Sequence, residues 1–196
     1  MGLQMGPYRE QDLSLAALAE HPSGIDLGPL QPQFPERLFT ADKMIHCATP
    51  EPLADLARLL ASMESEADSL RLIGRRHVRD CNSWMHNYHR LVKGRDRCVA
   101  LLHPDDLASR GIVDGGLITV RSRAGEVRLP CAASVDIMPG VISIPHGYGH
   151  HRQGIRAEIA KENAGVSCND ITDAHYLDAL SGNAALNGVA VEVFPA

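Results

Sequence analysis

The sequence predicts a mainly β protein, a small mixed barrel with short helices, preceded by an irregular N-terminal extension. From residue 70 onward, short β-rich runs follow one another with turn signals between them. Seven of the 12 prolines lie within the first 52 residues, where they interrupt regular structure because proline fixes φ and donates no N–H. We therefore divide the chain into a proline-rich connector with short helices, residues 1–69, and a barrel domain, residues 70–196.

Two short helices are expected in the connector. Ser14 is placed to cap a helix that runs to Glu20. A second helix should begin at Thr49 with Pro50 in its first position, and Leu53, Leu56 and Leu60 would share one face. The polar stretch ESEADS, residues 64–69, is expected to be a linker.

The barrel domain is predicted to contain six strands and one buried helix. The helix runs from Pro104 to Arg110, with acidic residues in its first turn and Gly111 after its end. A tight turn at residues 123–126 predicts a hairpin. In chain order, the predicted strands are LRLIGRR, RCVALL around Val99, LITVRS, EVRLPC, VISIP and VAVEVF.

Composition excludes several classes of protein. The 44% hydrophobic and 22% charged fractions are those of an ordinary globular chain, and the net charge of −5 argues against a nucleic-acid binder. The basic residues cluster between Arg71 and Arg97, which favours a small anionic ligand. No apolar run approaches the ~20 residues of a membrane span, and no secretory signal opens the chain. We expect no membrane contact and a cytoplasmic location, although a longer parent protein could be exported.

The cysteines are scattered. Five are present, and no CxxC pair occurs among them. This spacing predicts free thiols and neither a zinc knuckle nor a local iron–sulfur motif.

The first candidate binding segment runs from Gly74 to Asn87. A glycine at the end of a strand lets a backbone approach a ligand, and nearby guanidinium groups can bind a pyrophosphate. The other side chains offer polar contacts and one flat ring to a heterocycle; the alternative is a solvated basic loop with a packed Trp. The candidate residues are Gly74, Arg75, Arg76, Arg79, Asn82, Ser83, Trp84, His86 and Asn87.

The second candidate segment begins at His146. Three histidines within six residues suggest zinc, but the two intervening glycines argue against a helix that could present ligands at i, i+4 spacing. We therefore predict no metal site. His146, Gly147 and Tyr148 are instead candidates for contacts to an organic ligand, and a Tyr148 packed in the core is the alternative.

The third candidate segment contains Asn169, Asp170 and Asn187. Amide and carboxylate groups can read the adjacent N–H donors of guanine. Turn formation explains the same residues equally well. The sequence contains no GxSxG, no P-loop and no GxGxxG motif at the start of a helix, and no catalytic residue is assigned.

The order of these elements resembles a known family. The run from HPDDLASRG through DGGLITVRSRAGEVRLPC to MPGVISIPHGYG is similar to the dinucleotide-binding domain of the dimethyl sulfoxide reductase family of molybdopterin oxidoreductases. The stretches GRRHVRDCNSWMHN and CNDITDAHYLDALSGNAALNGVAVEV resemble its other cofactor-facing segments. In that family this domain is a double-psi β-barrel, so the resemblance implies that fold here.

The resemblance also implies a function. The chain would hold bis(molybdopterin guanine dinucleotide), with molybdenum or tungsten. The loop from Gly74 to about Asn82 would embrace one pterin dinucleotide, and the His146 turn would face the pterin. Asn169, Asn187 and Asp170 would also contact the cofactor. Its partners would be the pterin dinucleotide and the remaining domains of a formate-dehydrogenase-like parent oxidoreductase. The catalytic metal ligand and any iron–sulfur cluster would lie in those absent domains, so the fragment alone would be inactive.

A second hypothesis is kept. The same fold could serve as a stand-alone double-psi barrel that binds a protein or nucleotide partner, because fold does not fix function. In that case the Gly74–Asn87 loop and the His146 turn would have no reason to share one cavity. A self-processing decarboxylase of this barrel class needs a Gly-Ser cleavage site, which the sequence lacks.

Overall fold

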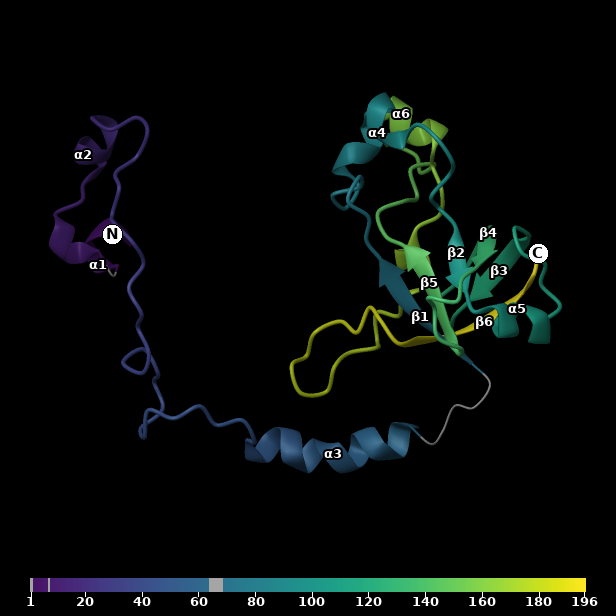
Figure 1. Cartoon of the computed structure of the whole chain (residues 1–196), viewed down its shortest axis with the longest axis horizontal. Helices are drawn as coiled ribbons and strands as arrows, with labels where there is room; N and C mark the ends of the chain where they lie inside the picture. Colours follow the sequence, from purple (N-terminus) through teal and green to yellow (C-terminus); the bar gives the residue numbers. More distant parts are fainter. Residues whose placement is uncertain (1, 7, 64–68) are drawn as a thin grey trace. The chain divides into compact units, whose positions relative to one another are not determined.

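The computed structural model describes residues 2–6, 8–63 and 69–196. The chain divides into two compact units, Met1–Ala48 and Thr49–Ala196 (Figure 1). Most of the predicted linker, residues 64–68, lies outside the described residues. Within the described residues, no helix is both long and apolar enough to span a membrane.

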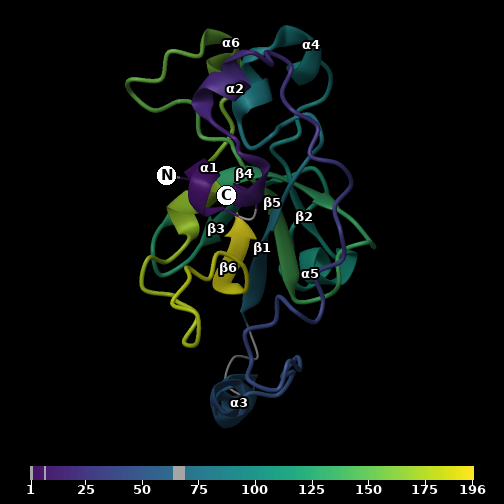
Figure 2. The same cartoon turned by 90° about the vertical axis from the view of Figure 1, so that its left-hand side faces the viewer.

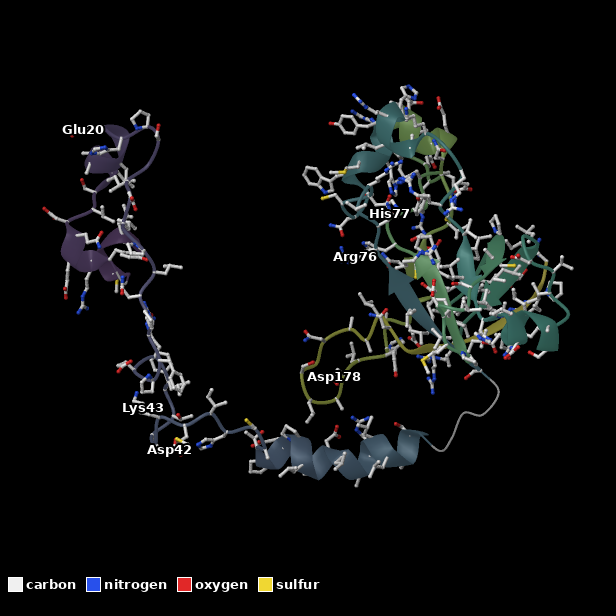
Figure 3. All side chains as sticks on the ribbon, in the orientation of Figure 1. Glu20, Asp42, Lys43, Arg76, His77 and Asp178 are labelled. Atoms are coloured by element: carbon white, nitrogen blue, oxygen red, sulfur yellow. The ribbon has the colours of Figure 1, made fainter. Side chains whose placement is uncertain are left out.

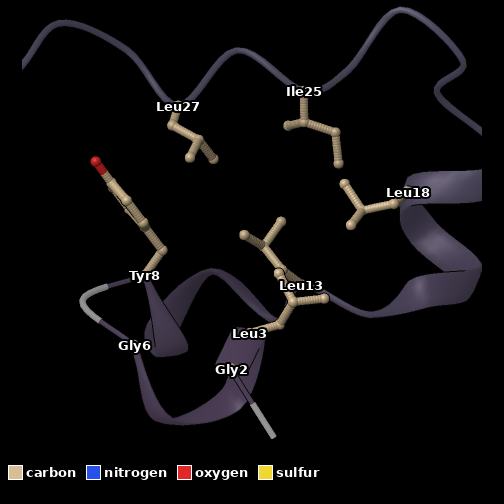
Figure 4. A pocket seen from close by; sticks show the side chains of 8 residues that line it. All are labelled: Gly2, Leu3, Gly6, Tyr8, Leu13, Leu18, Ile25 and Leu27. Atoms are coloured by element: carbon tan, nitrogen blue, oxygen red, sulfur yellow. The ribbon is translucent and has the colours of Figure 1, made fainter. Parts of the chain in front are cut away.

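The first unit consists of short helices and irregular chain. Its elements are α1 (Gly2–Met5), η1 (Arg9–Gln11) and α2 (Leu15–Ala19). Ser14 caps α2 as predicted, because its Oγ accepts a hydrogen bond from the N–H of Ala17 at 3.1 Å. The helices and the extended chain after them enclose an apolar cavity of about 210 Å³, lined by Gly2, Leu3, Gly6, Tyr8, Leu13, Leu18, Ile25 and Leu27 (Figure 4).

Helix α3 (Pro50–Met63) begins at the predicted proline. Its apolar residues Leu53, Leu56 and Leu60 are about half exposed. The sequence grouped this helix with the connector, whereas the structure groups it with the barrel. A cavity of about 480 Å³ is lined by residues of α3, by Arg71 and Arg123, and by residues between 173 and 190.

The barrel is closed by six strands in the order β1-β5-β2-β4-β3-β6. Strand β1 is parallel to β5, and β2 is parallel to β4; the remaining neighbours are antiparallel. This closed barrel confirms the predicted fold class. The strands are β1 (Leu70–Arg75), β2 (Ala100–Leu102), β3 (Leu117–Arg121), β4 (Glu126–Ala133), β5 (Val141–Pro145) and β6 (Val189–Pro195).

Alternating side chains fill the barrel. In β4, Val127, Leu129 and Cys131 are buried, whereas the residues between them are more exposed, as the two-residue period of a strand requires. The predicted hairpin joins β3 to β4, and its turn is closed by the N–H of Ser122 donating to the carbonyl of Gly125 at 2.9 Å. The resulting core includes Leu72, Leu102, Ile118, Ile142, Ile144 and Val191.

Helix α5 (Pro104–Ser109) confirms the predicted helix. Its first turn is capped by His103 Nδ1, which accepts from the N–H of Asp105 at 3.2 Å. The Asp106 carboxylate accepts from the N–H of Gly140 at 2.8 Å and pairs with Arg110 at 3.1 Å. These bonds tie the helix to the turn that precedes β5.

A cap of short elements stands beyond the carboxyl ends of β1 and β5 (Figures 1 and 2). We define the cap as residues 76–98 and 146–169. The sequence predicted no helix here, and it extended the two neighbouring strands to Arg76 and to Arg97, slightly beyond the ends of β1 and β2. The structure adds η2 (Trp84–Asn87), α4 (His89–Val92), α6 (Glu158–Glu162) and the start of η3 (Cys168–Ile171).

Candidate functional site

Two loops leave the barrel side by side at one edge. Strands β1 and β5 are parallel, with Arg75 opposite Pro145, and the N–H of His146 donates to the carbonyl of Arg75 at 2.9 Å. Figure 3 shows Arg76 and His77 where the chain leaves β1. The first two candidate segments therefore begin next to each other, because the carboxyl ends of neighbouring parallel strands share an edge.

Close backbone contact holds these two loops together. Gly147 has φ of 96°, and a Cβ there would lie 2.0 Å from the carbonyl oxygen of Asn82. Asn82 and Cys81 themselves have φ of 60° and 43°, a left-handed conformation that non-glycine residues rarely adopt. Such backbone conformations persist only where the surrounding structure enforces them, often at functional sites.

The third segment packs on the His146 turn. The N–H groups of Gly149 and His150 both donate to the carbonyl of Ala164, at 2.8 and 3.1 Å. A Cβ on Gly149 would lie 2.7 Å from the Cβ of Ser167. Residues 164–169 are thereby brought against the turn.

The three segments line one open cavity of about 370 Å³. A volume of this size suits part of a small organic ligand. Its lining is mixed, with amides, hydroxyls, two histidines and one arginine beside glycine and apolar groups. The lining residues are Asn82, Ser83, His146, Gly147, Tyr148, Gly149, His150, Arg152, Ile155, Ser167, Cys168 and Asn169.

A row of neighbouring polar side chains, which we call the polar chain, runs from the interior of the cap to this cavity. Asp80 and His86 are only 3% and 1% exposed. Arg97 Nη2 donates to Asp80 Oδ1 at 3.2 Å, and His86 Nε2 lies 3.2 Å from the same oxygen. The other nitrogen of His86, Nδ1, is 2.8 Å from Nε2 of His150, which lies in the cavity wall.

Burial favours the neutral forms of two histidines at this wall. It lowers the pKa of both His86 and His150, because desolvation disfavours the imidazolium; for His86, the nearby Asp80 opposes this effect. Burial raises the pKa of Tyr148 to about 12. The Tyr148 ring packs against His86 with 4.4 Å between ring centroids, so Tyr148 contributes both to packing and to the cavity wall.

Two ion pairs fix the third segment. Arg152 pairs with Asp170, and Arg123, in the β3–β4 hairpin, pairs with Asp173. The hairpin also approaches the backbone closely, since a Cβ on Gly125 would lie 2.6 Å from the carbonyl oxygen of Asp170. These contacts set the position of the wall that carries Asn169.

The structure brings six of the predicted site residues together. They come from all three segments, which lie up to 87 positions apart in sequence. Those in the cavity wall are Asn82, Ser83, His146, Gly147, Tyr148 and Asn169.

Three predicted contacts are used inside the fold instead. The guanidinium of Arg75 donates to the carbonyls of Val99 at 2.7 Å and Ser143 at 3.1 Å, so it links strand ends. His86 is buried in the polar chain described above. The side-chain oxygen of Asn87 accepts from the N–H of Ala160 at 3.2 Å, which ties η2 to α6.

The remaining predicted residues are not among those that line the cavity. Gly74 and Asn187 contact each other, with the Gly74 N–H donating to Asn187 Oδ1 at 2.8 Å. Arg76 donates to Asn82 Oδ1 at 2.7 Å. Arg79 is exposed, Trp84 is 80% exposed, and Asp170 is engaged by Arg152.

Several lining residues were missed by the sequence reasoning. His150 was considered only as a metal ligand, although its place after the glycine-rich turn could have marked it. Arg152 lies outside the basic cluster, and Ser167 carries no sequence signal that separates it from an ordinary turn residue. Among the described residues, no group of three or more His, Cys, Asp or Glu side chains is arranged to hold a metal ion.

The lining fits the pterin dinucleotide that the resemblance implies. Amides and hydroxyls at Asn82, Ser83 and Asn169 can donate and accept hydrogen bonds to a polar heterocycle. The missing side chains of Gly147 and Gly149 leave room for close approach, and Arg152 brings positive charge to the wall. The volume accommodates one end of a dinucleotide rather than the whole.

The barrel and the cap match a known family. Residues 70–190 match the family described as "Molydopterin dinucleotide binding domain". The match contains all the residues that line the cavity. It confirms the resemblance noted from the sequence.

Curated relatives and a solved structure agree with this match. The chain is 39% identical over 56 residues to the dimethyl sulfoxide/trimethylamine N-oxide reductase of Rhodobacter capsulatus, covering 29% of this chain and 7% of the relative. It is 28% identical over 112 residues to a tetrathionate reductase subunit of Salmonella typhimurium, covering 48% and 11%. Acetylene hydratase from Pelobacter acetylenicus has the same fold, with a TM-score of 0.51, 22% identity and coverage of 72% of this chain and 20% of that one.

Proposed function

This chain belongs to the molydopterin dinucleotide binding domain family, and from that membership we propose that the cap cavity holds one end of the pterin dinucleotide. The observation that carries the proposal is the convergence of three distant segments on one polar cavity inside the matched region. The shared cavity also favours this function over a stand-alone barrel for other partners, in which these loops need not meet.

The residues of this chain bind and orient the cofactor in this proposal. Asn82, Ser83 and Asn169 hydrogen-bond its polar groups, and the glycines of the His146 turn let the bound end approach the backbone. Arg152 offsets negative charge. The bound cofactor supplies redox chemistry through its metal, molybdenum or tungsten.

The catalytic unit would be a longer protein. The chain spans only 7% and 11% of the two relatives named above. We propose that other domains of a parent oxidoreductase provide the metal ligand, the substrate site and any iron–sulfur cluster. The two relatives are named for different substrates, so the formate-dehydrogenase-like character suggested by the sequence remains a prediction about those domains.

Trp84 offers a direct test. It is the single tryptophan of the chain and follows Asn82 and Ser83 of the cavity wall. Titration with GDP, which carries the guanine and the pyrophosphate of the dinucleotide, should change its fluorescence with one-site saturation. Asn169→Ala should weaken GDP binding about fivefold through the loss of one or two hydrogen bonds.

The control is Asn183→Ala, a change at an exposed amide outside the cavity. It should bind GDP like the wild type. Saturable binding that is equally weakened by both changes, or by neither, would place the ligand elsewhere. A wild type that binds neither GDP nor pterin would count against the proposed function itself.

A further inference from the structure

Asp80 fixes the hydrogen-bond direction of the histidine pair beside the cavity. Its carboxylate is buried and pairs with Arg97, and His86 Nε2 lies 3.2 Å from Oδ1. The approach does not have the geometry of a hydrogen bond, because His86 Nε2 has no hydrogen-bond partner among the described residues. The negative charge of the carboxylate at 3.2 Å nevertheless favours a proton on Nε2 over a bare lone pair, so we expect His86 to carry its proton there. A neutral imidazole has only one N–H. His86 Nδ1 is therefore the acceptor.

The second histidine must then donate. His86 Nδ1 and His150 Nε2 are 2.8 Å apart, and a hydrogen bond at that distance needs one proton. With His86 Nδ1 as acceptor, the proton belongs to His150 Nε2. A neutral His150 is left with an unprotonated Nδ1, which can only accept.

We propose that His150 is a ligand-binding residue that accepts a hydrogen bond, through Nδ1, from the amino group of the aminopyrimidinone ring that guanine and pterin share. Asp80 and His86 are positioning residues that set this tautomer. The inference rests on the proposed function and adds which chemical group the cavity reads. His150 lines the cavity, and none of the side chains in the structure's described ranges bonds its Nδ1.

This arrangement selects a heterocycle over a phosphate. Phosphate oxygens accept hydrogen bonds, so they would be repelled by a bare Nδ1. Guanine presents an amino group and a ring N–H on one edge, and both are donors. A site built around a fixed hydrogen-bonding group discriminates strongly against ligands that lack the matching partner.

The surroundings keep His150 neutral. On the loop after β1, Asp80 is paired with Arg97 at 3.2 Å and has His77 at 3.9 Å. Burial lowers the pKa of His150, and the neighbouring His86 lowers it further. His146 lies near His86, and Asp96 and Cys98 lie near Tyr148, whose ring packs on His86.

The tautomers can be read directly. Long-range ¹H–¹⁵N NMR of the histidine rings in the whole chain at pH 7.5 should show both His86 and His150 protonated at Nε2. Assignment uses His86→Gln and His150→Gln. Asp80→Asn removes the charge that orients the pair, so His86 should shift toward protonation at Nδ1. A wild-type His150 with its proton on Nδ1 overturns the proposal even if no ligand is added.

Binding tests the ligand group. Wild-type protein should bind GDP about tenfold more tightly than inosine diphosphate, which lacks the amino group, or should prefer pterin over lumazine by a similar factor. The first preference identifies the guanine end as the occupant and the second identifies the pterin end. His150→Leu should abolish the preference, whereas the control His151→Leu, at the exposed next residue, should keep it.

The outcomes separate the two claims. A His150→Leu protein that binds GDP or pterin with unchanged affinity and selectivity overturns the role of His150 and leaves the cofactor-binding function standing. A wild type that binds GDP and inosine diphosphate equally well, and pterin and lumazine equally well, also overturns the role of His150 and leaves the cofactor-binding function standing. A wild type that binds neither GDP nor pterin overturns both claims.

Discussion

The two cavities of this chain differ in how their walls are built. The cavity in the first unit is lined only by residues between 2 and 27, nearly all of them apolar. The cap cavity is lined by segments from three parts of the sequence, between residues 82 and 169. The first is a local contact of neighbouring turns, whereas the second depends on the closed barrel beneath it.

The difference indicates which cavity can serve as a binding site. Apolar walls on a short, irregular segment can collapse on themselves, because few hydrogen bonds hold them apart. The cap walls are fixed by backbone hydrogen bonds to Arg75 and Ala164 and by glycine contacts that exclude any side chain. A rigid scaffold that positions polar loops is the usual setting of a functional site.

The largest expected effect is at Gly147. Gly147→Ala would place a Cβ 2.0 Å from the carbonyl oxygen of Asn82 in a left-handed backbone conformation. We expect a loss of about 3 kcal/mol in unfolding free energy, from strain and overpacking together, and a loss of GDP binding. Urea denaturation measures the first effect.

Gly154→Ala is the matched control. Gly154 also has positive φ, at 88°, but nothing lies within 4 Å of its Cβ position. It should therefore lose only the conformational part, about 1 kcal/mol. Equal destabilisation by the two changes would show that the contact with Asn82 does not hold the loops together.

The buried His86 and the partly buried His150 make the stability of the second unit depend on pH. Burial lowers the folded-state pKa of His86 and His150, so the unfolded chain binds more protons once the pH falls below the ordinary histidine value of about 6.5. The unfolding free energy should fall between about pH 7 and 5. In His86→Gln/His150→Gln this fall should be smaller; an unchanged pH dependence would contradict the assigned burial.

A smaller effect is expected at the rim of the cavity. Arg152→Ala breaks an exposed ion pair with Asp170, and such pairs contribute about 0–1 kcal/mol. Thermal unfolding should change little, whereas GDP binding should weaken severalfold because a positive charge is lost. Arg156→Ala, which removes an exposed arginine outside the cavity lining, is the control. Equal weakening by both would point to a general charge effect.

The smallest effect should follow removal of the first unit. Deleting residues 1–48 should shift the Tm of the barrel by less than about 2 °C, or about 0.5 kcal/mol, because the barrel core lies entirely in the second unit. Differential scanning calorimetry measures this shift. A large loss of stability would show that the first unit supports the cap or the barrel.

Much of the barrel could be predicted from local sequence signals. Strands such as VISIP and the helix at Pro104 carry their own periodicity and caps, so their type follows from local physics. The cap elements are too short for such signals. Helices α4 and α6 have four and five residues and depend on tertiary contacts such as the bond between Asn87 and Ala160.

The site was predictable where backbone geometry marks it. Gly147 stands out because a glycine-rich turn after a strand indicates close approach. The role of Arg75 could not be predicted, because a guanidinium beside a loop bonds carbonyls or phosphates equally well. Only the fold places the carbonyls of Val99 and Ser143 within its reach. The burial of His86 likewise could not be predicted, because it depends on the distant His150 as well as on Asp80 of the same loop.

The most direct test of the account is amide hydrogen–deuterium exchange of the whole chain with and without saturating GDP. Exchange should slow in residues 81–83, 146–150 and 167–169, and it should stay unchanged in the apolar cavity of residues 2–27. Protection confined to residues 2–27 or 173–190, with none in the three cap segments, would contradict the cavity assigned here.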